Sequence, residues 1–301
     1  MNGNNGAAPV KAILAASALL LCAAAGAQTK SAADGIAEYR KMLEDGNPAE
    51  LFEAKGELLW KQKRGPKAAS LEACDLGQGA GKVKRAFVEL PRHFADTNKV
   101  QDLESRLLTC METLQGFSAA EIAKTPFGRG EQANVEALVA WIAAESRGQR
   151  FNLPQGHVEE KKMAELGKRA FFYRAGPYDF SCASCHSVAG QRIRLQDLPD
   201  LTKNPGDGIG FAAWPAYRVS SGELWTMQRR LNDCYRQQRF PVPRLCLRRD
   251  GGPGRLYGCE RQGCRVDRPG PQALNREHTC TRSNHALPAQ HWPPCWPAAP
   301  T

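Results

Sequence analysis

The sequence predicts a mostly α-helical fold made of two related halves, and two observations support this prediction. First, two pairs of amphipathic segments recur along the chain, which is the signature of a degenerate internal repeat. Second, the stretch CASCH at residues 182–186 has the Cys-x-x-Cys-His spacing by which c-type haem is attached to protein. Since this motif is complete in the second half only, we expect two cytochrome c-like helical domains, the first of them lacking haem.

The first 27 residues predict an export signal rather than part of the fold. Lys11 precedes an apolar run, and the small residues AGA at 25–27 suit a signal peptidase, so we place cleavage after Ala27. Cys22 could mark a lipid anchor, but Leu21 is bulky where that signal needs a small residue. No second apolar segment of spanning length follows. We therefore expect a periplasmic protein without a membrane span, in an oxidising compartment.

The first repeated pair aligns the haem motif with a degraded copy of itself. The stretches LFEAKGELLWKQ (51–62) and MAELGKRAFFYR (163–174) both predict amphipathic helices. In this alignment Cys185 corresponds to Cys74, whereas Leu71 stands at the position of Cys182 and Asp75 at that of His186. One thioether cysteine and the axial histidine are thus missing, and we expect no haem in the first half.

The second repeated pair places an arginine and a cysteine one helical turn apart in each half. RLLTCMETLQGF (106–117) resembles RLNDCYRQQRF (230–240), so that Arg106 and Cys110 correspond to Arg230 and Cys234. Capping-box spacing between Ser220 and Glu223 predicts that the later helix starts near residue 220; Leu224, Met227, Leu231 and Cys234 then follow at helical intervals.

The spacing leaves two candidates for the second axial ligand of the iron. Met227 would give an ordinary electron-transfer cytochrome, and Cys234 lies on the same helix face. The repeat favours Cys234, because the degraded half keeps a cysteine at the matching position. Arg230 would then favour the thiolate and could bind a sulfur oxyanion, unless it is a solvated surface arginine like its neighbours Arg229, Arg236 and Arg239.

In the first half, the loss of the iron leaves Cys74 and Cys110 facing each other. After export to an oxidising compartment we expect these two cysteines to form a disulfide, the alternative being two buried thiols.

From about Gly35 to Pro243 the chain resembles the A subunits of the SoxAX cytochrome complexes of bacterial sulfur oxidation. The resemblance is carried by EACDLGQGAG, LLTCMETLQGF, CASCH, WPAYR and RRLNDCYRQQRFP. It implies cytochrome c-like domains over 35–155 and 156–245, of the type in which a disulfide replaces the first haem. One covalent haem c would be held through thioethers by Cys182 and Cys185, with His186 and Cys234 as axial iron ligands.

The resemblance also implies an activity and partners. The family is an L-cysteine S-thiosulfotransferase, which joins thiosulfate oxidatively to a cysteine of the carrier protein SoxYZ and passes the electrons to cytochrome c. Cys234 would be the catalytic cysteine, modified to a persulfide, and Arg230 would bind the substrate. A separate small cytochrome c, SoxX, would dock on this chain as a heterodimer. The alternative, suggested by Met227, is an electron-transfer cytochrome that is not an enzyme.

Residues 246–301 depart from this pattern. They hold eight arginines against four acids, with five cysteines, and show no helical or strand periodicity. Cysteines beside His278, His285 and His291 could suggest a metal site, but we favour an aberrant, disordered tail produced by a reading-frame error near codon 244, which would leave the chain as written inactive. The remaining surplus of the net charge of +10 is too small to predict a nucleic-acid partner.

Overall fold

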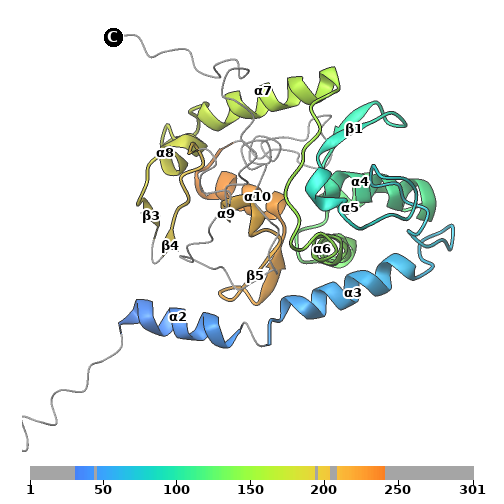
Figure 1. Ribbon diagram of the computed structural model, residues 1–301, viewed down its shortest axis with the longest axis horizontal. Helices are drawn as coiled ribbons and strands as arrows, with labels where there is room; N and C mark the ends of the chain where they lie inside the picture. Colours follow the sequence, from blue (N-terminus) through green and yellow to red (C-terminus); the bar gives the residue numbers. More distant parts are fainter. Residues whose placement is uncertain (1–30, 44–45, 194–195, 204–208, 241–301) are drawn as a thin grey trace, which may run out of the picture. The chain divides into compact units, whose positions relative to one another are not determined.

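The computed structural model describes residues 31–43, 46–193, 196–203 and 209–240 (Figure 1). The export signal expected at residues 1–27 and the tail expected at 246–301 lie outside these ranges. The chain divides into two compact units, Met1–Met42 and Leu43–Thr301. In the first unit the structure describes one helix, α2 (Ala32–Met42), which begins with reciprocal hydrogen bonds between Ser31 and Asp34.

The described part of the second unit is mostly helical, as predicted, with strands only in short hairpins. None of its helices is both long and apolar enough to cross a membrane. The elements of the first half are α3 (Ala49–Lys61), η1 (Phe87–Glu89), β1 (Arg92–Phe94), β2 (Lys99–Gln101), α4 (Leu103–Cys110), η2 (Met111–Gln115), α5 (Ala119–Lys124) and α6 (Gly130–Ala144).

The second half begins with a helix that has a capping box made by His157 and Glu160. Its elements are α7 (Val158–Phe172), α8 (Cys182–His186), β3 (Arg192–Ile193), β4 (Gln196–Asp197), α9 (Ile209–Ala212), β5 (Ala216–Arg218), β6 (Glu223–Trp225) and α10 (Met227–Gln237).

The internal repeat is visible in the backbone. A bridge pairs Arg64 with Ala69 in the first half, and an equivalent bridge pairs Ala175 with Phe180 in the second. Each half then has an antiparallel hairpin, β1–β2 or β5–β6, that follows a cis-proline peptide bond and leads directly into a helix. Both halves thus share a helix, a bridge, a hairpin after a cis-proline and a second helix, in the same order.

The two halves differ by an insertion beside the haem motif. The offset between equivalent positions is 111 residues at the bridges (64 to 175) and 124 at the hairpins (92 to 216), so the second half is thirteen residues longer in between. This is the region that contains β3, β4 and α9.

The start of the last helix differs from the prediction. Glu223 is not a capping residue, because residues 223–225 form β6 and pair with 216–218. The helix begins only at Met227, and its N-cap is Thr226, whose hydroxyl accepts a hydrogen bond from the backbone N–H of Arg229. The capping-box spacing of Ser220 and Glu223 therefore occurs by chance within the hairpin. Leu224, which also fits the helical spacing, belongs to β6 and not to α10.

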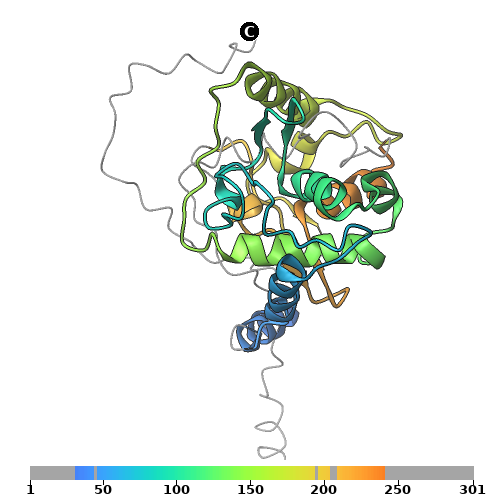
Figure 2. The ribbon, with the colours of Figure 1, turned by 90° about the vertical axis from the view of Figure 1, so that its right-hand side faces the viewer.

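The core of the first half forms where α3 crosses α6 (Figures 1 and 2). The rings of Trp60 and Trp141 lie 5.6 Å apart across this crossing. Gly56 allows the close approach, since a Cβ at this position would lie 2.1 Å from the carbonyl oxygen of Ala137. A second core, which includes Phe151, Phe171, Phe211 and Leu231, supports the haem motif, and Phe87 packs against both cores.

We expect Gly56→Ala to destabilise the protein by roughly 1–3 kcal/mol or more, because the added methyl group would clash with backbone atoms of α6 that cannot move independently. Urea unfolding followed by circular dichroism measures this change. Gly35→Ala is the matched control, since it is also a helical glycine but has open space around it. There the substitution should stabilise slightly. Equal effects at both positions would contradict the close crossing.

Candidate haem and cysteine site

The haem motif lies on the short helix α8. Ser181 caps this helix: its hydroxyl accepts from the backbone N–H of Ser184, and the Ser184 side chain accepts in return from the N–H of Ser181. Cys182 and Cys185 are both partly buried and are not joined in a disulfide. Because they are three residues apart on a helix, their thiols lie on one face, as two thioether bonds to one haem require.

His186 is held in the orientation that an axial ligand needs. Its Nδ1 lies 3.0 Å from the carbonyl oxygen of Pro199. A carbonyl oxygen can only accept, so Nδ1 carries the proton and Nε2 keeps the lone pair that binds iron. The backbone carbonyl of His186 also accepts from Leu201, at 2.7 Å. The donor set of α8 therefore fits a covalently bound haem.

The last helix brings Cys234 to this motif. Burial raises the pKa of the Cys234 thiol, and Arg230 opposes this by lowering it. The same thiol is influenced electrostatically by Cys185 on α8, and the pKa of its neighbour Tyr235, raised to about 12 mainly by burial, is influenced by Cys182. The geometry agrees, because Leu231 of α10 belongs to the same core cluster as Ala183 and Cys182 of α8.

Arg230 acts on Cys234 in the expected direction, but it does not act alone. Its side chain donates to Asp233 at 3.2 Å, and Asp233 also accepts from Arg236 at 2.8 Å and Gln237 at 2.6 Å. Asp233 partly offsets the guanidinium charge and raises the pKa of Cys234, whereas a second cation, Arg218 of β5, lowers it. Sequence reasoning missed both residues, although the i, i+3 spacing of Arg230 and Asp233 was a visible signal.

Arg229 is not the solvated surface arginine that the sequence suggested. It is buried, donates to both oxygens of Glu136 on α6 at 3.3 and 3.2 Å, and forms a further ion pair with Glu223. Its guanidinium also lies over the ring of Trp225, 4.7 Å from the centroid. The two adjacent arginines therefore differ in role: Arg229 attaches α10 to the first half, and Arg230 lies near Cys234.

Met227 remains near the motif as well. It is the first residue of α10 and packs, partly buried, against the same core cluster as Cys182. The structure thus places both sequence-predicted candidates for the distal position on the helix that approaches α8.

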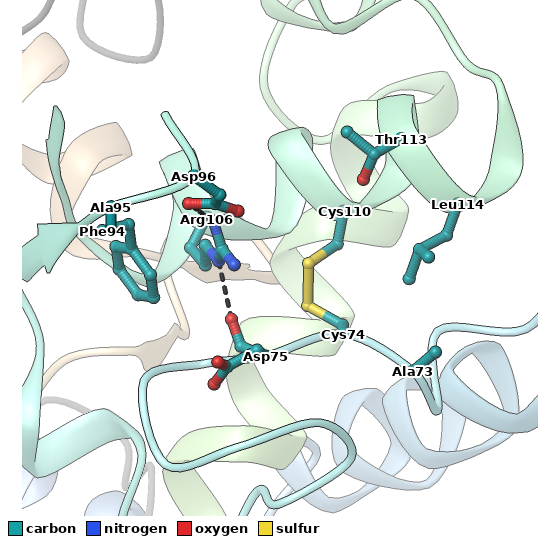
Figure 3. A pocket seen from close by; sticks show the side chains of 10 residues that line it. All are labelled: Ala73, Cys74, Asp75, Phe94, Ala95, Asp96, Arg106, Cys110, Thr113 and Leu114. Carbon is teal, nitrogen blue, oxygen red and sulfur yellow. Dashed lines mark hydrogen bonds and ion pairs between the residues drawn. A yellow bond between two sulfur atoms is a disulfide. The ribbon is translucent and has the colours of Figure 1, made fainter. Parts of the chain in front are cut away.

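In the first half a disulfide joins Cys74 to Cys110, the pair expected there (Figure 3). Both cysteines line a pocket of about 380 Å³, whose other walls come from residues near Asp75, Asp96 and Arg106. Arg106, the counterpart of Arg230, enters this pocket but is fully engaged: it donates to the backbone oxygen of Asp75 at 2.6 Å and pairs with Asp96 at 2.7 Å.

The residues of this pocket do not fit a covalent haem. Leu71 is fully buried where the second half has a thioether cysteine. Burial opposes ionisation of Asp75, but hydrogen bonds from the N–H groups of Gly77 and Gly79 outweigh it and lower the pKa of this carboxyl. A carboxylate engaged in a loop thus stands at the position of the axial histidine.

Comparison with known proteins gives a consistent result. A family model described as the SoxA/TsdA cytochrome c domain matches residues 55–151. The L-cysteine S-thiosulfotransferase subunit SoxA of Hydrogenophilus thermoluteolus is 55% identical over 208 residues, which is 69% of this chain and 76% of that protein. A subunit of the same name from Hydrogenobacter thermophilus is 31% identical over 72% of this chain and 80% of its own length.

A solved structure shares the fold. The crystal structure of SoxXA from P. pantotrophus matches with a TM-score of 0.62, covering 78% of this chain and 84% of that one, at 21% sequence identity.

The burial of Glu136 predicts a pH dependence of stability. Burial raises the pKa of Glu136 from 4.5 to about 7, although Arg229 opposes the shift. From pH 4.5 to 7 the unfolded chain releases this proton while the folded protein keeps it, so the free energy of unfolding should fall as the pH rises, by up to about 1.4 kcal/mol per pH unit. Glu136→Gln should flatten this slope in urea titrations. An unchanged slope would show that Glu136 is ionised throughout the range.

Proposed function

The chain belongs to the SoxA family, and on this premise we propose that it is the catalytic, haem-binding subunit of an L-cysteine S-thiosulfotransferase. The reaction would join thiosulfate to a cysteine of a SoxYZ-type carrier, forming one S–S bond and releasing one proton and two electrons. The observation that carries the proposal is that α10, which carries Cys234 and, one turn earlier, Arg230, packs through Leu231 in one core cluster with Ala183 and Cys182 of the haem motif. The names of the relatives support the activity.

We assign one haem c, held by thioether bonds to Cys182 and Cys185 and by His186. Its role would be to take up the electrons that the reaction releases and to pass them to cytochrome c. The hydrogen bond from His186 to Pro199 keeps the imidazole in the ligating tautomer. Cys234 would be the second axial ligand and the sulfur that carries the persulfide.

The substrate would be recognised by charge. Thiosulfate is a dianion, and two cations, Arg230 and Arg218, act on the Cys234 thiol. The Arg230 side chain keeps 22% of its surface exposed, so its guanidinium can reach a ligand that arrives from solvent. Asp233 accepts a hydrogen bond from this guanidinium and partly offsets its charge.

We further propose a periplasmic location, in line with the export signal expected at residues 1–27, and a heterodimer with a small SoxX-type cytochrome. The described residues contain no helix able to cross a membrane. The heterodimer is supported by the SoxXA crystal structure, which contains a chain of the same fold.

A second candidate function, electron transfer without catalysis, is favoured by the position of Met227. This residue packs with Cys182 in one cluster and could ligate the iron in place of Cys234. The two functions therefore differ in which residue of α10 controls the spectrum of the iron.

Cys234→Ala should abolish thiosulfate conjugation and change the ferric spectrum while the haem stays covalently attached, because Cys182 and Cys185 are untouched. Arg230→Ala should lower kcat/KM by roughly 10- to 100-fold, since it removes a charged contact worth about 1.5–3 kcal/mol. Arg236→Ala is the matched control: it also pairs with Asp233, but 71% of its side-chain surface is exposed. If Met227→Leu changes the spectrum and Cys234→Ala does not, the electron carrier is the correct function.

Mass spectrometry of the purified protein should find one covalent haem, on the peptide containing residues 182–186, and a disulfide-linked peptide pair containing Cys74 and Cys110. The reason is that Leu71 and Asp75 replace two of the three groups that haem attachment and ligation need. Two haems per chain, or alkylation of both cysteines without prior reduction, would contradict the assignment.

A further inference from the structure

The N-termini of α4 and α10 meet inside the second unit, although the two helices belong to different halves and begin 124 residues apart. By the repeat they are equivalent helices: α4 ends at the disulfide cysteine Cys110, and α10 carries Cys234. In Figure 1, α10 lies at the centre of the molecule, between α7 and α8 on one side and α4 to α6 on the other.

The contact between the two N-termini is reciprocal. Thr226, the N-cap of α10, donates its hydroxyl proton to Oε2 of Glu104, the second residue of α4, at 2.9 Å. In return, Gln228, the second residue of α10, donates from its side chain to Oδ2 of Asp102, the N-cap of α4, at 2.6 Å. Oε1 of Glu104 also accepts from the backbone N–H of Gln228 at 3.2 Å.

Glu104 is the residue on which this contact depends. Two helix N-termini that face each other repel, because each carries a partial positive charge and unpaired N–H groups. A buried carboxyl group between them satisfies donors of α10 with both of its oxygens. Burial raises the pKa of Glu104 well above its usual range, and Asp102 acts in the same direction, whereas the bonds from Thr226 and Gln228 lower it.

The other attachment of α10 described above also leads to the first half. Arg229, on the turn that follows Thr226, pairs with Glu136 of α6. Cys234 lies eight residues after Thr226, or about 12 Å along the helix axis. A small tilt at the N-terminus is therefore transmitted to the position of the Cys234 sulfur.

We propose that Glu104 is a positioning residue for Cys234: the half without haem holds α10 through Glu104, and so fixes the distance and direction at which Cys234 and Arg230 approach the haem motif. This inference rests on the proposed function. It gives the first half a role in the reaction that is exerted through α10.

Two nearly isosteric variants test the proposal in the full-length holoprotein. Glu104→Met keeps a side chain of similar length but removes both oxygens, so both bonds to α10 are lost whether or not the carboxyl carries a proton. Thr226→Val removes the hydroxyl, and Thr226→Ser keeps it. Ser118→Ala is the matched control, because it removes a cap hydrogen bond from α5, far along the chain from α10.

At a temperature where circular dichroism shows all variants folded, Glu104→Met and Thr226→Val should keep one haem per chain. Both should lose part of the ferric spectral signature that depends on Cys234, and kcat should fall roughly 10- to 100-fold with little change in KM. Thr226→Ser should restore both properties, and Ser118→Ala should change neither.

Two outcomes would overturn the proposal. If Glu104→Met and Thr226→Val lower only the melting temperature and leave the spectrum and kcat unchanged, Glu104 is merely structural, and the proposed function stands. If Cys234→Ala does not change the spectrum of the otherwise unaltered protein, the proposed function itself fails, and the role of Glu104 in positioning Cys234 fails with it.

Discussion

The buried contact of Glu104 with Thr226 and Gln228 is the constraint on which the arrangement of the second unit depends. It joins the N-termini of two equivalent helices and thereby sets one half of the repeat against the other. Polar groups are costly to bury without hydrogen-bond partners, so such a contact persists only where each oxygen has a partner. The ion pair of Arg229 with Glu136 adds a second polar attachment, and Phe87, which packs against both cores, adds an apolar one.

The two halves place equivalent helices and cysteines in the same arrangement but differ in what these cysteines bind. In the second half α8, with the two motif cysteines and His186, packs in one core cluster with α10, which carries Cys234. In the first half the equivalent cysteines form a disulfide, and Arg106 pairs with Asp96 and donates to the backbone oxygen of Asp75. The first half is thus held by covalent and polar cross-links, and it keeps the shape that holds α10.

Sequence reasoning predicted local features well and tertiary pairs poorly. The Cys-x-x-Cys-His spacing and the repeat located α8, the disulfide pair and the helix of Cys234, because each depends on short-range spacing or on comparison of two segments. The true start of α10 was missed, since a capping-box spacing also occurs by chance in a hairpin. Glu136 and Glu104 were missed because no periodicity in a single sequence reports which residues meet across about 90 or 120 positions.

The closed site of the first half has a consequence for the evolution of this chain. Leu71 is part of the core, Cys74 is bonded to Cys110, and Asp75 holds a loop through Gly77 and Gly79. Binding a covalent haem here would require a cysteine at 71, a histidine at 75 and an opened disulfide, and each change alone removes an existing stabilising contact without yet binding haem. On the proposed assignment of a single haem, the first half is therefore easier to keep without haem than to convert into a haem site.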